Sequence, residues 1–307
     1  MKGVVIKTTG SHYTVKIAKD ETVQCRLKGK FRIKGITSTN PIVVGDKVEV
    51  EKESTSWMIV KFYERKNKIL RKSVNLSKQT HIIASNIDQA ILMITLESPV
   101  TTTGFIDRFL VSANAYGVEA VLLLNKTDLL DEGMKKKKEY LKDIYEKIGY
   151  KFFAFSILRD DLSEIRSLMK DKVNMISGHS GVGKSTLINK LQPNLNINTQ
   201  QISETHKQGQ HTTTFSELYD LDFGGSIIDT PGIKGFGLVE LFPNEIGNYF
   251  PEFFIIKEKC KYYNCIHQNE PDCAVKASLE SGHIADSRYK NYLDMLAEED
   301  YFRTNNY

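Results

Sequence analysis

The chain has 307 residues, 40% of them hydrophobic and 26% charged, which is enough to build apolar cores in two or three domains. No apolar run approaches the ~20 residues needed to span a bilayer, so the pattern excludes an integral membrane protein. The first residues, Met1-Lys2-Gly3-Val4, begin like a strand and lack a signal-peptide pattern, so we expect a cytoplasmic protein.

Positive charge is concentrated in the first quarter of the chain. Residues 1–72 hold 17 Lys and Arg against 7 Asp and Glu, a net charge of +10, whereas the whole chain carries +4. The remaining residues therefore carry −6. A basic region on an otherwise acidic chain indicates a polyanionic partner, and we expect that partner to be RNA.

The same quarter has the pattern of an all-β domain. Turn sequences such as Asn40-Pro41 and Gly45-Asp46 separate short runs in which hydrophobic residues alternate with polar ones. The alternating runs are Val4 to Ile6, Tyr13 to Ile17, Val23 to Leu27, Val48 to Val50 and Trp57 to Phe62. Five short strands in about 65 residues predict an OB-fold barrel, which we place at residues 1–66.

Basic side chains alternate along one stretch of this region, and that stretch is the candidate nucleic-acid face. Its members are Lys28, Lys30, Arg32 and Lys34, with Phe31 among them. For any single lysine, a solvated strand or loop is the better explanation, but the basic character of the whole domain favours RNA. A second basic cluster, Arg65 to Lys72, fits a linker into the next domain.

Residues 67–237 have the pattern of an α/β domain with a mainly parallel sheet. An apolar run at Ile87 to Ile94 predicts a strand, and Phe105 to Tyr116 predicts an amphipathic helix. A second buried strand, Val121 to Leu124, leads directly into the tetrapeptide Asn125-Lys126-Thr127-Asp128. Further along the chain, Lys135 to Ile148 predicts a charged helix whose lysine run lies on a solvated face.

The tetrapeptide at 125–128 is the candidate guanine-reading loop. The Asp128 carboxylate can accept hydrogen bonds from guanine N1–H and N2–H₂, which adenine does not offer. Asn125 can tie this loop to the phosphate-binding loop, and the stem of Lys126 can lie over the base beside Thr127. A helix-capping N-x-x-D turn is the alternative.

Ser156 ends a predicted strand, where GTPases have the loop that backs the base, although Ile157 replaces the usual alanine.

The segment Gly178 to Ser185 matches the phosphate-binding pattern G-x-x-x-x-G-K-[ST]. It follows an apolar strand pattern at Val173 to Ser177 and precedes a helix pattern, so a chance glycine-rich turn is the weaker explanation. Backbone amides in such a loop converge on phosphate oxygens, Lys184 would reach the β- and γ-phosphates, and Ser185 would ligate Mg²⁺. The candidate GTP-binding residues here are Gly178, His179, Ser180, Gly181, Val182, Gly183, Lys184, Ser185 and Thr186.

Two segments after the phosphate loop have the character of switches. Lys207 to Thr214 is a polar stretch in which Thr213 is the candidate for a second Mg²⁺ hydroxyl, with an ordinary flexible loop as the alternative. The tetrapeptide Asp229-Thr230-Pro231-Gly232 follows another buried strand pattern. Asp229 would lie near Mg²⁺ through a water, and the Gly232 amide would face the γ-phosphate. Taken alone, this tetrapeptide is also a good turn sequence.

Three of the four cysteines lie close together near the C-terminus, within the pattern C-x₄-C-x-H-x₅-C. Three thiolates and an imidazole form a closed tetrahedral set for Zn²⁺, so we expect one structural zinc ion per chain. A disulfide is disfavoured in cytosol. The predicted ligands are Cys260, Cys265, His267 and Cys273. The remaining cysteine, Cys25, stands on a predicted strand and is expected in the barrel core.

The nucleotide-binding motifs stand in a permuted order, because an ordinary guanine-nucleotide switch runs phosphate loop, DxxG, then NKxD. Three further features accompany this order: the basic OB-like N-terminus, the H-T-T-T segment at residues 211–214 and the C-x₄-C-x-H-x₅-C segment. Together they make the chain resemble the bacterial family of small-ribosomal-subunit-dependent, circularly permuted GTPases. The resemblance covers essentially the whole chain. It implies late maturation of the 30S subunit, binding to 16S rRNA, and GTP hydrolysis that is slow alone and faster on the 30S particle. One departure is Gln210 before His211, where the family often has arginine.

Catalysis has one candidate in the chain besides Lys184. Many GTPases position the attacking water with a glutamine just after DxxG, but here that residue is Ile233. His211 is then the candidate for orienting water, with a hydrogen-bonded loop histidine as the alternative. We expect a monomer that binds GTP and GDP, with a largely helical zinc domain at 238–307. A GTPase acting on another RNA or on a protein, and an RNA-binding assembly protein with an idle nucleotide site, remain open.

Overall fold

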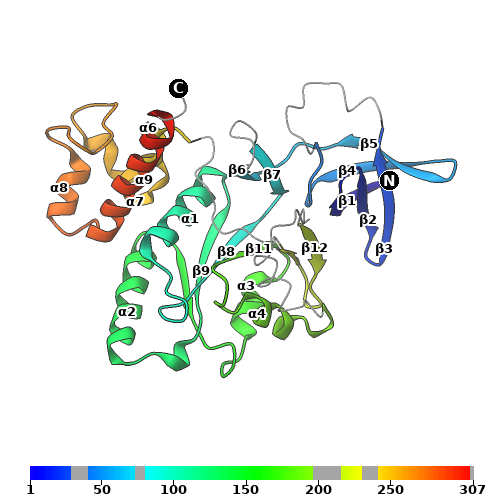
Figure 1. Cartoon of the computed structure of the whole chain (residues 1–307), viewed down its shortest axis with the longest axis horizontal. Coiled ribbons are helices and arrows are strands. Elements are labelled where there is room, and N and C mark those ends of the chain that lie inside the picture. Colours follow the sequence, from blue (N-terminus) through cyan, green and yellow to red (C-terminus); the bar gives the residue numbers. More distant parts are fainter. Residues whose placement is uncertain (29–40, 73–79, 196–215, 230–240, 305–307) are drawn as a thin grey trace.

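The computed structural model describes residues 1–28, 41–72, 80–195, 216–229 and 241–304. Three parts follow one another across the molecule: a small barrel, a central α/β domain, and a helical unit on the far side of that domain (Figure 1). This arrangement confirms the predicted multidomain fold. Within the described residues, no helix combines the length and the apolar character that crossing a bilayer requires.

The barrel consists of β1 (Lys2–Thr9), β2 (His12–Ala18), β3 (Glu21–Leu27), β4 (Lys47–Glu53) and β5 (Ser56–Phe62). The strand order is β1-β2-β3-β5-β4, and an additional β1–β4 pairing closes the sheet on itself. Val5, Val15, Cys25 and Ile59 are fully buried inside it. The alternation of hydrophobic residues therefore predicted both the strands and the core, including Cys25.

The cluster Arg65 to Lys72 joins the barrel to the central domain, as expected of a linker, but it is also structured. Its second half forms β6 (Lys68–Lys72), which pairs antiparallel with β7 (Thr80–Ser85). Arg65 donates through Nε and Nη2 to the two carboxylate oxygens of buried Asp46, at 2.6 and 2.7 Å, and the Ser85 hydroxyl donates to the same carboxylate at 2.6 Å. These bonds form a clamp, which we call the Asp46 clamp, between the barrel and the hairpin that leads into the central domain.

The central sheet has the order β10-β9-β8-β11-β13-β12, with parallel pairing except for β12. Its strands are β8 (Gln89–Ile94), β9 (Glu119–Leu124), β10 (Lys151–Ala154), β11 (Val173–Ser177), β12 (Glu217–Asp220) and β13 (Ser226–Asp229). The helices are α1 (Thr103–Ala115), α2 (Glu132–Lys147), α3 (Ser163–Met169) and α4 (Lys184–Leu191). One apolar core packs the sheet against α1 and α2, and a second core packs the opposite face against α3 and α4.

The barrel continues the central sheet. Strand β1 pairs antiparallel with β12, the outermost strand of the central domain, so the two domains share one eleven-stranded sheet. Residues that are far apart in the sequence therefore meet at a strand edge, as the position of β12 between the barrel and the rest of the sheet shows (Figure 1).

The C-terminal unit is helical, as predicted. It contains α6 (Pro243–Ile246), α7 (Pro251–Ile256), α8 (Ala274–Glu280) and α9 (Asp286–Thr304). Its apolar core includes Phe250, Phe253 and Tyr292, and also Val111 from α1 of the central domain. Because one core spans both parts, the unit is packed directly onto α1 rather than tethered by the chain alone (Figure 1).

Candidate functional site

The predicted nucleotide-binding loops lie at one edge of the central sheet. Residues 125–128 follow β9, Ser156 follows β10 after one intervening residue, and the loop at 178–183 follows β11. These strands are parallel, so their carboxyl ends share an edge, which is where open α/β sheets bind ligands. Asp229 is the last residue of β13, and its backbone reaches the same edge. Although the motifs follow a permuted order in the chain, the fold therefore brings their loops together at one edge of the sheet.

Asn125 joins three loops at this edge. Its side-chain amide donates from Nδ2 to the Val182 carbonyl at 2.8 Å, and its Oδ1 accepts from the Ile157 amide at 3.2 Å. The residue is only 4% exposed. Gly183 has φ +104°, and a Cβ there would lie 2.6 Å from Asn125 Nδ2. Close approach of the two loops thus requires glycine at 183 and an amide at 125, as the motifs have them.

The phosphate loop is folded around the ammonium group of Lys184. The Nζ atom donates to the carbonyls of Gly178 and His179, both at 2.7 Å. Gly178 has φ +144°, and a Cβ there would lie 2.4 Å from the Met93 carbonyl. Helix α4 begins at Lys184, with Ser185 buried in its first turn. The loop thus opens a helix N-terminus, which favours bound anions.

The base-reading loop is held in a tight turn. Lys126 adopts a left-handed backbone conformation with φ +66°, and its Nζ donates to the Ser98 carbonyl at 2.5 Å. The Ser156 hydroxyl is buried and has no partner of ordinary hydrogen-bond geometry among the described residues. Its proximity nevertheless lowers the pKa of Asp128, so this carboxyl is ionised and available as an acceptor at neutral pH.

The loop between β8 and α1, together with the first turn of α1, also contributes to this site, which the sequence did not indicate. In the loop, the Ser98 carbonyl accepts from Lys126. In the first turn of α1, Phe105 lies with its ring centroid 4.0 Å from the His179 ring. Pro99 Cδ lies 3.6 Å from the position of a Cβ on Gly181. The strand and helix patterns on either side were visible in the sequence, but no motif marks the loop between them as a neighbour of the phosphate loop.

Several predicted site residues cannot be placed in this way. His211, Thr213 and Gly232 lie outside the described residues. Asp229 is placed by its backbone only. The structure therefore brings together the base loop, the phosphate loop and the backbone of Asp229, while the switch residues stay predictions.

The cysteine–histidine cluster converges as a compact set of four ligand atoms. The Nδ1 atom of His267 lies 3.7 Å from Cys260 Sγ, 3.4 Å from Cys265 Sγ and 3.5 Å from Cys273 Sγ. All four ligand atoms lie within 4.8 Å of one another. A zinc ion with ~2.3 Å bonds to sulfur places tetrahedral ligands about 3.5–3.8 Å apart, so the cluster can hold one zinc ion.

Hydrogen bonds from α9 fix the segment that carries the cluster. Burial, reinforced by the neighbouring thiols, raises the pKa of Cys265 to about 12, so this thiol stays protonated at neutral pH unless a metal binds it. The Tyr289 hydroxyl donates to the His267 carbonyl at 2.7 Å, and the Tyr292 hydroxyl donates to the Ile266 carbonyl. These bonds from α9 fix the histidine-bearing turn, as outer-shell groups do around structural metals.

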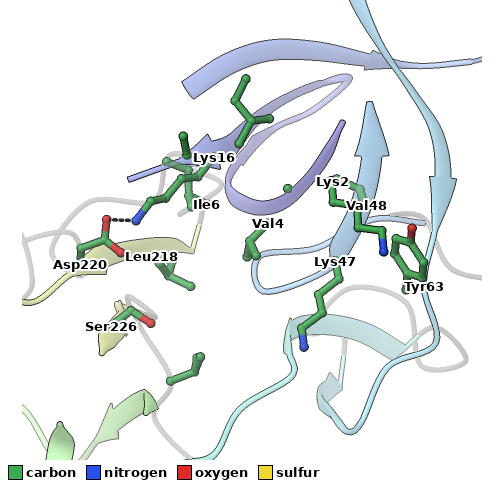
Figure 2. A pocket seen from close by; sticks show the side chains of 14 residues that line it. Lys2, Val4, Ile6, Lys16, Lys47, Val48, Tyr63, Leu218, Asp220 and Ser226 are labelled. Atoms are coloured by element: carbon green, nitrogen blue, oxygen red, sulfur yellow. Dashed lines mark hydrogen bonds and ion pairs between the residues drawn. The ribbon is translucent and has the colours of Figure 1, made fainter. Parts of the chain in front are cut away.

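A cavity between the barrel and the central domain lies away from both sites. A space of about 550 Å³ separates β1, β2 and β4 of the barrel from β12 and β13, and Val4, Ile6 and Leu218 line it with Lys2, Lys16 and Lys47 at its rim (Figure 2). The candidate chemistry lies instead at the carboxyl edge of the parallel strands, where the loops and the ionised Asp128 converge.

A phosphate loop and a guanine-reading loop in permuted order, on a parallel sheet fused to an OB barrel, define a circularly permuted GTPase. Family models agree: residues 62–239 match the RsgA GTPase and residues 2–58 match the RsgA N-terminal domain. The chain belongs to the RsgA GTPase family, and it is a GTP hydrolase.

Relatives match over nearly the whole chain. It is 56% identical to the small ribosomal subunit biogenesis GTPase RsgA of Flavobacterium johnsoniae, over 100% of this chain and 96% of the relative. It is 50% identical to the RsgA of Bacteroides fragilis, over 98% and 97%. Among solved structures, YjeQ from Thermotoga maritima gives a TM-score of 0.78 at 34% identity, with 97% of each chain covered. YloQ, described as a circularly permuted GTPase, gives 0.75 at 29%, covering 97% and 94%.

Proposed function

We propose that this chain assists the late maturation of the 30S ribosomal subunit by binding it, together with its 16S rRNA, and by hydrolysing GTP slowly alone and faster on the 30S particle. The relatives that match the whole chain are named as small ribosomal subunit biogenesis GTPases, which supports this assignment. The protein acts as a monomer in the cytoplasm, where ribosomes are assembled. The proposed domains are residues 1–66, 67–237 and 238–307.

The proposal that this site binds GTP rests on the bridge that Asn125 forms between two loops. It holds the base-reading loop and the phosphate loop at a fixed separation, with the buried Ser156 hydroxyl beside the ionised Asp128. GTP and GDP would place guanine at Asp128 and phosphates over Lys184. Mg²⁺ would be held by Ser185, with Thr213 as the candidate second hydroxyl, and would neutralise phosphate charge.

Two groups in the chain would serve hydrolysis. Lys184 stabilises the charge that develops on the β- and γ-phosphates, and His211 orients the attacking water. Since Ile233 cannot position water, the unassisted reaction would be slow. Replacement of His211 by alanine should leave GTP binding intact and remove stimulation by the 30S particle. Full stimulated turnover in that variant would eliminate the histidine while leaving the GTPase assignment in place.

The decisive measurement is GTP turnover against added 30S subunits, 50S subunits and free RNA. Selective stimulation by 30S is expected, and equal stimulation by all three would contradict the proposal. Charge reversal at Lys28, Lys30 and Arg32 should weaken 30S binding in a salt-dependent manner, because phosphate contacts release counterions. Reversal at Lys135, Lys136 and Lys137, on the solvated face of α2, is the matched control and should leave 30S binding unchanged.

A further inference from the structure

Three residues lie in one row across three adjacent strands at the edge of the central sheet. Lys7 of β1 is the register partner of Glu217 of β12, and Glu217 is the register partner of Asp229 of β13. Neighbouring strands lie ~4.8 Å apart, so the barrel backbone is about 10 Å from the backbone of Asp229, the first residue of the D-x-x-G motif. No other strand of the barrel pairs with the central sheet among the described residues.

Two ion pairs hold this junction from the barrel side. Lys7 Nζ lies 2.9 Å from a Glu217 carboxylate oxygen, and Lys16 of β2 pairs with Asp220 at the other end of β12. The Lys16–Asp220 pair is drawn as a dashed line in Figure 2. The two ion pairs therefore hold both ends of β12. The other neighbour of β12 is β13, which ends at Asp229.

Packing beneath the junction is incomplete, which makes these pairs important. The cavity of about 550 Å³ opens between β1 and β12, with Val4 and Ile6 on the barrel side and Leu218 facing them (Figure 2). The Asp46 clamp, by contrast, is a buried and fully bonded attachment. The barrel is thus fixed at the clamp, whereas at β12 it is held by a short ladder, two charged pairs and the packing of Ile6 against the core that contains Leu218. A tilt about the clamp would therefore act on β12.

We propose that Lys7 and Lys16 are positioning residues for GTP hydrolysis, which act through Glu217 and Asp220 to set the place of β12 and hence of Asp229. The inference deepens the proposed function, on which it rests: a polyanion bound to the barrel would tilt it and so alter the DxxG aspartate. Coupling is reciprocal, so the nucleotide would also alter the pose of the barrel.

The test is a set of charge reversals and charge swaps. Lys7→Glu and Lys16→Glu each place like charges across the junction. Adding Glu217→Lys to the first variant, or Asp220→Lys to the second, restores opposite charges. We expect either single reversal to lower 30S-stimulated kcat by about fivefold, the lower end of typical coupling, with GDP affinity unchanged. Each swapped double variant should return kcat to the parent value. Amide hydrogen exchange in β12 and β13 should rise in the single variants and fall back in the doubles.

A swap discriminates positioning from direct RNA contact, because a lysine that binds RNA is not restored by a second change on β12. The matched control is the pair Lys151–Glu119, an exposed contact of 2.7 Å at the opposite end of the same sheet. Lys151→Glu and its swap should leave kcat unchanged.

Two results would overturn the inference: single reversals without effect on kcat, or swaps that fail to restore it. Loss of 30S stimulation in the parent protein would instead refute the proposed function. In that case the positioning role is decided by the GTP turnover and the amide hydrogen exchange of the same variants in the absence of ribosomes, because neither measurement needs the 30S particle.

Discussion

Replacement of Arg288 by methionine should destabilise the contact between the central domain and the helical unit. The Arg288 side chain is 1% exposed on α9 and donates from Nη1 to Asp107 of α1 at 2.6 Å and from Nε to Glu252 of α7 at 2.7 Å. Its guanidinium carbon lies 4.4 Å from the centre of the Phe250 ring. Methionine keeps much of the volume against that ring but leaves two buried carboxylates without their cation.

The size of the loss follows from that imbalance. Removal of one partner of a buried ion pair typically costs about 3–5 kcal/mol, because the remaining charge stays buried. Asp107 keeps donors from Tyr145 at 2.8 Å and Asn291 at 2.6 Å, which places the expected loss at about 3 kcal/mol. Urea unfolding followed by far-UV circular dichroism, with zinc present, measures this difference.

The loss should depend on pH in a defined direction. Burial raises the pKa of Asp107, and attraction to Arg288 opposes that rise, so the pKa goes higher still in the variant. A carboxyl whose folded-state pKa exceeds its unfolded value stabilises the fold at low pH, and that contribution is lost as pH rises through the folded pKa. The deficit of Arg288→Met should therefore grow as the pH rises and shrink as the pH falls.

The control replaces Lys261, which pairs with Asp272 at 2.8 Å on the exposed side of the zinc-binding segment. Lys261→Met should cost about 0–1 kcal/mol, because solvent screens an exposed pair. Equal losses for Arg288→Met and Lys261→Met would refute the reasoning, and so would a deficit that grows as pH falls.

Three further outcomes are expected. Asp128→Asn should weaken guanine discrimination by roughly 1.5–3 kcal/mol, and competition between GTP and ATP measures it; an unchanged preference would remove Asp128 from base recognition. Lys184→Ala should lower both GTP affinity and turnover, and parent-like values by calorimetry and phosphate release would exclude its phosphate role. Metal analysis should give one zinc per chain, and Cys265→Ser should speed amide exchange in α7 and α8 while nucleotide still binds; a metal-free protein with parent-like exchange would refute the site.

The sequence predicted those features whose physical cause is local. Alternation of hydrophobic residues gave the five barrel strands, because side chains on a strand point alternately to the two faces. The phosphate loop was also visible, since a backbone with φ +144° at Gly178 and +104° at Gly183 demands glycine. Cysteine spacing predicted the zinc ligands for a similar reason: a tetrahedral set needs soft donors within a short loop.

Features that depend on two distant segments were not predictable in this way. The sequence around Arg65 fits a basic linker and does not reveal its ion pair, because the buried Asp46 that it binds lies nineteen residues earlier in the chain. The partnership of Asp107 with Arg288 spans 181 residues, and neither side chain belongs to a motif. The pairing of β1 with β12 likewise joins residues about 210 positions apart, at the edge strand of the central sheet.

Permutation explains why the central domain is held from both sides. Because the base-reading loop comes before the phosphate loop in the chain, the central sheet begins at β8, which follows the β6–β7 pair, and its last strand ends at Asp229. Both appended parts then contact elements beside nucleotide loops: the barrel holds β12, and the helical unit holds α1, whose Phe105 contacts His179. A partner that moved either appended part would therefore act on the central domain through that attachment. A charge reversal at Lys7 alters only the first attachment and Arg288→Met only the second, so additive effects on stimulated turnover would mean that the two act independently.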